Sequence, residues 1–245
     1  MKIVATVEAR MTSSRLPGKV LMRADGKPML EHLLTRLKLV ESLDEIVLAT
    51  TTNESDNVLS ELAEDLMVKC FRGSESNVML RVLNAAREVN ADVIVEVTGD
   101  CPILDPDIIE QAIGIFLHNE CDYASNVNVP SYPIGMDAQV FKTETLDRSY
   151  AMTSDPLDHE HVTRHIRQHP EIFKHINIIA PPELHWPELG LALDEQADYE
   201  LIKTIIEHFS KEEQQFRCRD VIELLRHRMP HLVEMNNDVI RRGME

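Results

Sequence analysis

Cationic and hydroxyl side chains gather just after the first apolar run of this chain. Arg10, Arg15 and Lys19 fall within ten residues of one another, and Ser13 and Ser14 lie between them. A loop of this kind, between a strand and a helix, can hold several phosphate oxygens through charge-assisted hydrogen bonds. The loop has neither a P-loop pattern nor the GxGxxG pattern of a dinucleotide fold. The segment therefore predicts a polyphosphate site built from side chains, with an ordinary basic surface loop as the alternative.

Two aspartates that follow apolar runs could hold a metal ion. Asp100 comes after the apolar run 93–97, and Asp194 comes after the run 191–193. Ligands of open α/β sheets bind beyond the carboxyl ends of the strands, so Asp100 and the basic loop should face one crevice. Mg²⁺ is often held by one or two carboxylates together with substrate phosphate, and we expect Asp100 to be such a ligand. For Asp194, metal binding and capping of the next helix are both open.

Two further groups have competing interpretations. Asp105 and Asp107 resemble a DxD metal motif, although Asp105 is more simply the cap of the helix that follows it. His161 and His165 are four residues apart, which would place them on one face of a predicted helix over 156–169. Zinc binding is the minor interpretation of these histidines, and hydrogen bonding to a polar substrate or a subunit contact is the major one.

Apolar, β-branched runs alternate with segments of helical period, which is typical of βα units around a mostly parallel sheet. The predicted strands are 3–7, 45–50, 67–71, 93–97, 137–141, 175–180 and 190–193. The predicted helices are 29–39, 57–64, 78–89, 105–116, 156–169, 198–209 and 219–228. The sequence thus predicts a single α/β domain over 1–245, in which 126–190 is an insertion, a lid or a dimer arm.

The composition narrows the class of protein. A formal net charge of −17 opposes binding to nucleic-acid backbones and to anionic lipid surfaces. No window approaches the roughly 18 apolar residues of a membrane helix, and the first residues do not resemble a signal peptide, so we expect a cytoplasmic enzyme. The four cysteines form no CxxC pair and are expected to be reduced thiols.

Several motifs, taken in order along nearly the whole chain, resemble the cytidylyltransferases that make CMP-activated acidic sugars. These include CMP-Kdo and CMP-sialic acid synthetases, and the similarity is greatest to the SpsF-like branch of spore-coat polysaccharide biosynthesis. The first motif is specific, whereas most of the later ones would be weak in isolation. The motifs are ARMTSSRLPGKV at 9–20, GKPML at 26–30, FRGSE at 71–75, TGDCP at 98–102, GMD at 135–137, EHVT at 160–163 and LD…DY at 193–199.

The resemblance implies a Rossmann-like, three-layer fold of the nucleotide-diphospho-sugar transferase type, assembled as a homodimer. The residues that it implies for CTP are Arg10, Ser13, Ser14, Arg15, Lys19, Arg72, Ser74, Asn77 and Arg81. The residues that it implies for Mg²⁺ are Asp100 and Asp194, and those for the sugar are Asp137, Glu160 and His161.

The activity implied is attack of a sugar hydroxyl on the α-phosphate of CTP with release of pyrophosphate, for surface polysaccharide or glycoconjugate synthesis. Arg15, Lys19 and Asp100 would be the catalytic groups. The residues between Asp194 and Asp198 depart from the family pattern, which leaves changed sugar selectivity or lost catalysis open. The alternatives are transfer of another nucleotide to a sugar 1-phosphate, a glycosyltransferase that uses a nucleotide sugar, and a non-catalytic nucleotide-binding homologue.

Overall fold

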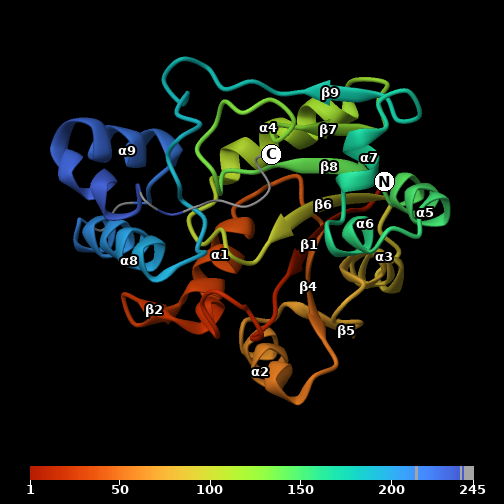
Figure 1. Ribbon diagram of the computed structural model, residues 1–245, viewed down its shortest axis with the longest axis horizontal. Helices are drawn as coiled ribbons and strands as arrows, with labels where there is room; N and C mark the ends of the chain where they lie inside the picture. The colour runs from red at the N-terminus through yellow and green to blue at the C-terminus, as the bar shows by residue number, and fades with distance from the viewer. Residues whose placement is uncertain (213–214, 238, 240–245) are drawn as a thin grey trace.

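A seven-stranded sheet forms the centre of the protein. The computed structural model describes residues 1–212, 215–237 and 239. The strand order is β5-β4-β1-β6-β8-β7-β9, and Figure 1 shows the sheet as a twisted band from β5 below to β9 above. The strands are β1 (Ile3–Glu8), β4 (Glu45–Thr51), β5 (Lys69–Gly73), β6 (Val93–Thr98), β7 (Tyr123–Ser125), β8 (Gln139–Lys142) and β9 (His175–Asn177). The predicted α/β class with a mostly parallel, Rossmann-like sheet is confirmed.

The strands of the first half are all parallel, whereas β8 runs against both of its neighbours. β1 lies between β4 and β6, and Val4, Ala5 and Val7 in it are fully buried. A central parallel strand is covered on both faces, which is why its sequence is an almost continuous apolar run. The carboxyl ends of these parallel strands meet at one edge, and the loops that follow them lie there together.

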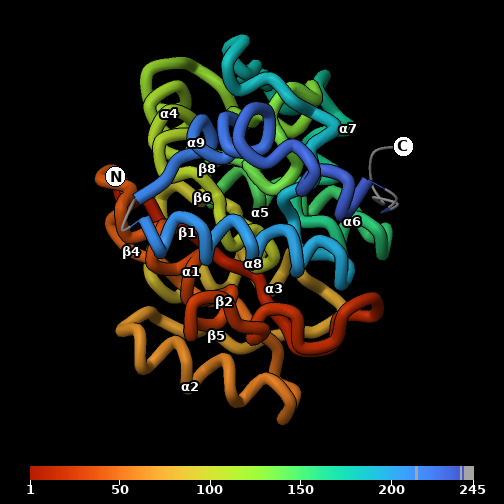
Figure 2. The backbone as a smooth tube through the Cα atoms, turned by 90° about the vertical axis from the view of Figure 1, so that its left-hand side faces the viewer, coloured from red at the N-terminus to blue at the C-terminus, as the bar shows by residue number. Residues whose placement is uncertain are grey.

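Helices cover both faces of the sheet, which gives three layers. One face carries α1 (Met29–Leu37), α2 (Asn57–Asp65), α4 (Pro106–Leu117), α8 (Gln196–Lys211) and α9 (Cys218–Glu223), which share one apolar cluster. The other face carries α3 (Val78–Glu88), α5 (Thr143–Met152) and α7 (Arg164–Gln168), which share a second cluster. Figure 2 shows α8 and α9 in front of the sheet, with α8 beside the hairpin that contains β2.

The helix predicted over 156–169 is wrong as a single element. It is broken into α6 (Pro156–Glu160) and α7, because His161 adopts an extended conformation with ψ 93°. The break turns Val162 into the core, where it is 3% exposed, and allows the Thr163 hydroxyl to donate to Gln139 in the sheet. Burial of these two side chains outweighs the local preference for a continuous helix.

Other boundaries differ where tertiary contacts decide them. β5 begins at Lys69 rather than 67, because Met67 has φ 54° and completes the turn after α2. β9 ends at Asn177 rather than 180, and the strand predicted over 190–193 is only an isolated bridge between Gly190 and Ile134. These segments contain apolar residues because they pack on the sheet, not because they pair within it.

Some elements lie outside the sequence prediction or exceed it. α5 and β7 were not predicted, and neither was the hairpin of β2 (Arg23–Ala24) and β3 (Lys27–Pro28). Its Asp25-Gly26 turn has positive φ at both residues, as a tight hairpin requires. The helix predicted over 219–228 is α9 followed by a π-helical stretch, Leu224–Arg228.

The segment 126–190 contributes both β8 and β9 to the central sheet. Its predicted action as a lid or a dimer arm stays a prediction, as does the homodimer. In the described part of the chain, no helix has the length and apolar character needed to cross a bilayer. All four cysteines are free thiols, as predicted.

Candidate functional site

The basic loop lies at the carboxyl edge of the sheet, against Asp100 and Asp194. Lys19 Nζ is 2.7 Å from Asp100 Oδ2 and 3.3 Å from Asp194 Oδ1. Arg15 Nη2 lies 2.6 Å from the same Asp194 oxygen. We call these four residues the charged cradle. The predicted proximity of Asp100 to the basic loop is confirmed, and the structure adds Asp194 to the same cluster.

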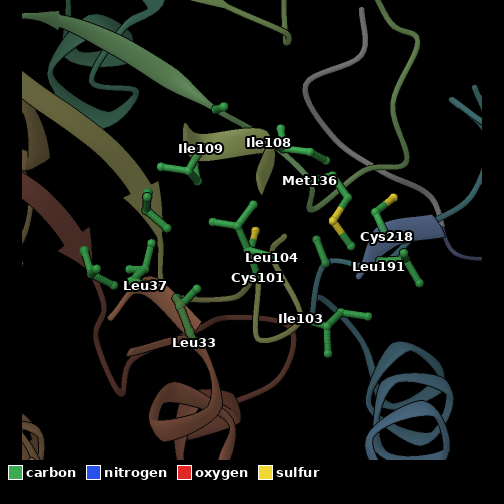
Figure 3. Packing of buried hydrophobic residues seen from close by; sticks show 14 of the residues in the cluster. Leu33, Leu37, Cys101, Ile103, Leu104, Ile108, Ile109, Met136, Leu191 and Cys218 are labelled. Atoms are coloured by element: carbon green, nitrogen blue, oxygen red, sulfur yellow. The ribbon is translucent and has the colours of Figure 1, made fainter. Parts of the chain in front are cut away.

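Asp100 is positioned by a close approach between two strand ends. Gly99 N donates to Glu8 O over 2.8 Å, and a Cβ at Gly99 would lie 2.8 Å from both Glu8 O and the Ala9 Cβ. Only glycine therefore lets the end of β6 lie this near the start of the basic loop. The residues that follow Asp100 are anchored in the core, where Cys101 and Leu104 pack beneath α1 (Figure 3). Packing of these residues in the core thus fixes the position of the backbone at Asp100.

Asp194 is brought to the cradle by a backbone hydrogen bond between its neighbour Leu193 and Asp100. Leu193 N donates to Asp100 O over 2.8 Å, so the chain entering α8 runs directly beside Asp100. Glu195, not Asp194, is the N-cap of α8, and it forms a capping box with Asp198. The Asp198 carboxylate also accepts from the backbone N–H of Asp194 at 3.1 Å. Because other residues cap this helix, the Asp194 side chain is left to face Lys19 and Arg15.

The charges of the cradle hold one another in their ionised forms. Burial by itself would lower the pKa of Lys19, but the adjacent Asp100 and Asp194 outweigh it and raise that pKa. Burial would likewise raise the pKa of Asp100, but Lys19 and a hydrogen bond from Thr98 hold it below its usual range. Lys19 and Asp100 are therefore both charged at neutral pH, and each of the four cradle residues is already paired.

The carboxylate pair fits Mg²⁺ that is held together with a polyphosphate. Asp100 and Asp194 present oxygen donors to one point, since both contact the same ammonium group. Among the described residues, no three His, Cys, Asp or Glu side chains gather into a group that could hold a metal. Mg²⁺ commonly takes one or two carboxylates and fills its other positions with water and phosphate, whereas structural zinc needs four protein ligands.

The histidines near α6 and α7 do not form a zinc site. Because His161 lies in the break between the helices, it and His165 do not share a helical face, and that expectation is wrong. His165 is 6% exposed and its Nδ1 lies 3.0 Å from Ser149 Oγ. His165 is therefore a core residue, while His161 is exposed.

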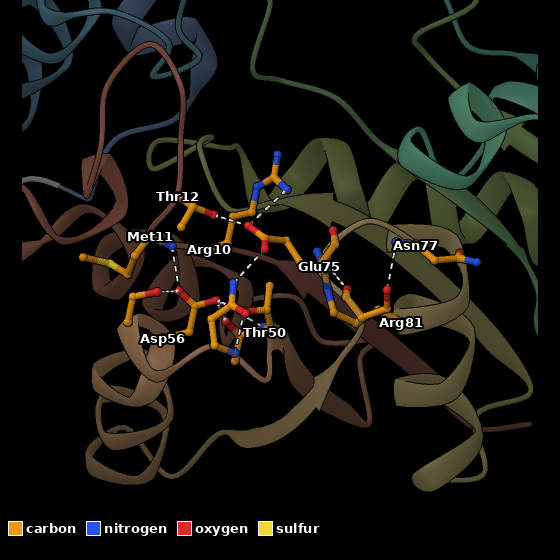
Figure 4. Close-up of polar contacts among 12 residues, drawn as sticks. Arg10, Met11, Thr12, Thr50, Asp56, Glu75, Asn77 and Arg81 are labelled. Atoms are coloured by element: carbon orange, nitrogen blue, oxygen red, sulfur yellow. Dashed lines mark hydrogen bonds and ion pairs between the residues drawn. The ribbon is translucent and has the colours of Figure 1, made fainter.

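Two acidic residues that the sequence reasoning missed tie the basic loop to neighbouring strand ends (Figure 4). Glu75 accepts from Thr12 Oγ1 at 2.6 Å and lies 3.9 Å from Arg10 Nη1. Asp56 accepts from Met11 N at 2.9 Å. Both follow strands whose carboxyl ends share the edge with β1, so their positions after those strands were the signal that could have found them.

The segment 72–81 contacts the basic loop through Glu75, and side chains bond it to its own backbone and to the end of β4. Arg72 donates to Thr51 O, and Arg81, which is 2% exposed, donates to Ser74 O. Asn77 caps α3, and its N–H donates to the Ser74 hydroxyl. These four side chains keep the loop after β5 in a defined shape. Their predicted contact with CTP stays a prediction.

A cavity of about 930 Å³ opens beside the cradle, over β8 and α7. Asp194 lies in its wall and so joins it to the cradle, and Gln139 forms part of its floor. Of the residues predicted for the sugar, Asp137 and His161 line the cavity. Glu160 is exposed and lies outside the lining. The volume is within the range of small-molecule sites.

The floor of the cavity is a buried hydrogen-bond network around Gln139. Its carbonyl accepts from Tyr123 Oη at 2.6 Å and from Thr163 Oγ1 at 2.7 Å, and its amide donates to Glu96. All four side chains are buried. Because the Gln139 carbonyl accepts two bonds and its amide donates to Glu96, the network fixes one orientation of Gln139 beneath the ligand space.

Three carboxyl groups between the cradle and the cavity have raised pKa values. Burial, opposed by Arg81, raises the pKa of Glu8 to about 7. Burial and the neighbouring Glu8 hold the pKa of Glu96 well above its usual range. Burial, with Asp100 nearby, raises the pKa of Asp137 to about 6. Burial thus disfavours the charged form of all three carboxyl groups.

The DxD pair has a structural role. Asp105 is 3% exposed and its carboxylate accepts from the backbone of Asp107 and of Cys218, at 2.9 and 2.7 Å. Arg217 pairs with Asp107 at 3.0 Å. The predicted cap role of Asp105 is confirmed, and the pair joins α4 to α9 instead of facing the cavity.

Comparison with known proteins gives the family of a chain that has this sheet, charged cradle and adjoining cavity. The family model described as cytidylyltransferase matches residues 4–230, so the chain belongs to the cytidylyltransferase family. This confirms the family to which the sequence motifs pointed.

Two relatives and one solved structure illustrate the similarity. The spore coat polysaccharide biosynthesis protein SpsF of Bacillus subtilis is 32% identical over 208 residues, covering 83% of this chain and 85% of SpsF. A 3-deoxy-manno-octulosonate cytidylyltransferase of Chloroherpeton thalassium is 30% identical over 188 residues, with 74% of each chain covered. A cytidylyltransferase structure from Leptospira borgpetersenii has a TM-score of 0.89 and 31% identity, and covers 95% of this chain and 97% of that one.

Proposed function

We propose that this protein activates a sugar by transferring CMP from CTP, with release of pyrophosphate, for surface polysaccharide or glycoconjugate synthesis. The observation that carries the proposal is the charged cradle, whose Lys19 lies 2.7 Å from Asp100 at the edge where a cavity also opens. Family membership and similarity to a 3-deoxy-manno-octulosonate cytidylyltransferase support CTP and an acidic keto-sugar as the substrates.

The proposed reaction is an in-line displacement at the α-phosphorus. The anomeric hydroxyl of the sugar forms the new O–P bond and loses its proton, while the bond to the bridging oxygen breaks and pyrophosphate leaves. Such reactions depend on positioning and charge neutralisation more than on a protein nucleophile. Arg15 and Lys19 would bind the phosphate oxygens and stabilise the charge that develops on the leaving pyrophosphate.

The proposed cofactor is Mg²⁺, held by Asp100 and Asp194 together with the triphosphate. When bound, it would neutralise phosphate oxygens and polarise the attacking hydroxyl. The carboxylates would then turn from Lys19 and Arg15 toward the metal, so the two cations would become available to the phosphates. Before binding, the carboxylates and the cations of the cradle would neutralise each other. After binding, the metal would neutralise the carboxylates and the phosphates would neutralise the cations.

The test is pyrophosphate release from CTP with a panel of octulosonic and nonulosonic acids, with sugar 1-phosphates as a second acceptor class. Asp100→Asn should lower the rate about 100-fold or more while circular dichroism shows the native fold. Asp107→Asn is the matched control, because Asp107 belongs to the DxD pair but pairs with Arg217 away from the cavity.

Near-normal pyrophosphate release by folded Asp100→Asn would contradict the proposed mechanism. A large loss in Asp107→Asn with no loss in Asp100→Asn would instead favour a glycosyltransferase.

A further inference from the structure

Two arginines of α7 line the cavity, and they differ in their partners. Arg164 Nη1 lies 3.1 Å from Asp155 and also pairs with Asp158. Arg167 has no hydrogen-bond or ion-pair partner for its guanidinium in the described part of the chain, and its Nε is buried. An unsatisfied buried donor is costly, and for a charged group the cost is greater. A ligand in the cavity could therefore supply the hydrogen-bond acceptor that Arg167 lacks among the described residues.

The nearest acidic groups do not neutralise Arg167. Glu96 and Asp137 attract it electrostatically, but no described carboxylate oxygen lies within 4.0 Å of its guanidinium. Burial and Glu8 hold the pKa of Glu96 well above its usual range, which weakens its attraction for Arg167. A positive charge thus faces the ligand space with its hydrogen-bonding capacity unused.

We propose that Arg167 binds the carboxylate of the acceptor and makes the cavity selective for sugar acids. The inference rests on the proposed function and assigns the residue that recognises the acid group of its acceptor. A guanidinium matches a carboxylate with two parallel N–H···O bonds. A sugar 1-phosphate carries a second negative charge and would need a further cation, yet the neighbouring Arg164 is already held by Asp155 and Asp158.

The rest of the cavity wall suits the hydroxyl-rich body of such a sugar. Asn128 and Asn177 lie on one wall and are bonded to each other at 3.0 Å, and Gln139 is fixed on the floor. Neutral amides offer donors and acceptors to hydroxyls without attracting a second anion. One arginine without a described partner, beside amide side chains, is the arrangement expected for a ligand with one acid group.

The experiment compares steady-state kinetics of the wild type, Arg167→Gln and Arg167→Lys with CTP and Mg²⁺. The acceptors are 3-deoxy-manno-octulosonate and N-acetylneuraminate, their methyl esters, and glucose 1-phosphate. Arg167→Gln should raise the KM for the sugar acid about 10- to 100-fold and should lose the preference for acid over ester. Arg167→Lys should lose less, because it keeps the charge without the fork. The Kd for CTP, measured by calorimetry, should stay unchanged in both.

Arg87→Gln is the control, since Arg87 is a surface residue paired with Asp147 that does not line the cavity. An unchanged KM for the sugar acid in folded Arg167→Gln would overturn the inference and leave the proposed function standing. Turnover of glucose 1-phosphate or the esters in preference to the acids would also overturn it. If no acceptor releases pyrophosphate with the folded wild type, both the inference and the proposed function fail.

Discussion

The charged cradle and the cavity share one edge of the sheet, but their cations are in opposite situations. Lys19 contacts Asp100 at 2.7 Å and Arg15 contacts Asp194 at 2.6 Å, so the cradle neutralises itself. Arg167 in the cavity wall has no such partner among the described residues. A ligand of the cradle must therefore replace existing ion pairs. A ligand of the cavity instead forms a new ion pair with Arg167.

This difference has a consequence for binding energetics. Separating an internal ion pair requires that both of its charges find new partners, because an uncompensated buried charge is strongly unfavourable. In the cradle, the phosphates can satisfy Lys19 and Arg15, but only a cation can satisfy the carboxylates they leave. In the cavity, one anionic group is enough. We therefore expect two ligands to enter the cradle together and one to enter the cavity alone.

The largest expected effect comes from removing the central cation of the cradle. Lys19→Met should lower kcat for pyrophosphate release about 100-fold or more, because Lys19 both contacts Asp100 and would bind the leaving phosphates. The check is a coupled pyrophosphate assay on protein that circular dichroism shows to be folded. Lys27→Met is a suitable control, since Lys27 is exposed and pairs with Glu31, four residues along the chain. A kcat within about threefold of the wild type would mean that the cradle is not where the chemistry occurs.

An intermediate effect is expected when the metal is withdrawn. Calorimetry should show that CTP binds about tenfold or more tightly with Mg²⁺ than with EDTA, because the carboxylates need the cation once Lys19 and Arg15 turn to the phosphates. Asp194→Asn should reduce the effect of Mg²⁺ on the Kd for CTP, because Arg15 then has no ion pair with residue 194 to break when it binds phosphate. Equal Kd values with and without Mg²⁺ would show that the cradle does not exchange partners.

The smallest effect concerns Glu8, which lies between the two regions. Its pKa is about 7 in the folded protein against 4.5 as the ordinary value, because of burial. Between these pH values the unfolded chain binds fewer protons than the folded one, so wild-type stability falls as pH rises. At pH 8, the free energy of unfolding of Glu8→Gln should therefore exceed that of the wild type by on the order of 1 kcal/mol. The variant should then unfold at a higher temperature. The advantage should shrink toward pH 5.

Thermal unfolding monitored at pH 5, 6, 7 and 8 checks this expectation. Glu75→Gln supplies the contrast, because hydrogen bonds from Thr12 and Asn53 lower the pKa of Glu75. That variant should show no gain at pH 8. If the difference in stability between Glu8→Gln and the wild type is the same at every pH, the pKa of Glu8 is not raised by its surroundings.

The elements that the sequence predicts well are those whose pattern is local. β1, β4 and β6 are apolar runs because both of their faces are covered, and the amphipathic helices α1, α3 and α4 carry their apolar residues at helical spacing. The break at His161 is different. It depends on Val162 and Thr163 reaching the sheet, and no residue nearby in the sequence signals it.

The site divides in the same way. Residue types alone predict a basic loop and an aspartate at neighbouring strand ends, because parallel strands place their carboxyl ends at one edge. The contacts of Asp56 and Glu75 could not be assigned, since each depends on which atoms of the basic loop lie opposite it in space: the Met11 backbone N–H for Asp56 and the Thr12 hydroxyl for Glu75. Segment 72–81 shows the same limit, because Arg81 is buried against backbone that only the fold brings near.

The sequence by itself determined the alternation of strands and helices, the basic loop, and the family to which the chain belongs, because these follow from periodicity and from short motifs. Only the tertiary structure decided that Asp194 joins Asp100 on Lys19, that Glu195 and Asp198 take over the cap of α8, and that Arg167 has no partner within the described part of the chain. Pairing of charges depends on distances between segments far apart in the chain, and packing of the core sets those distances.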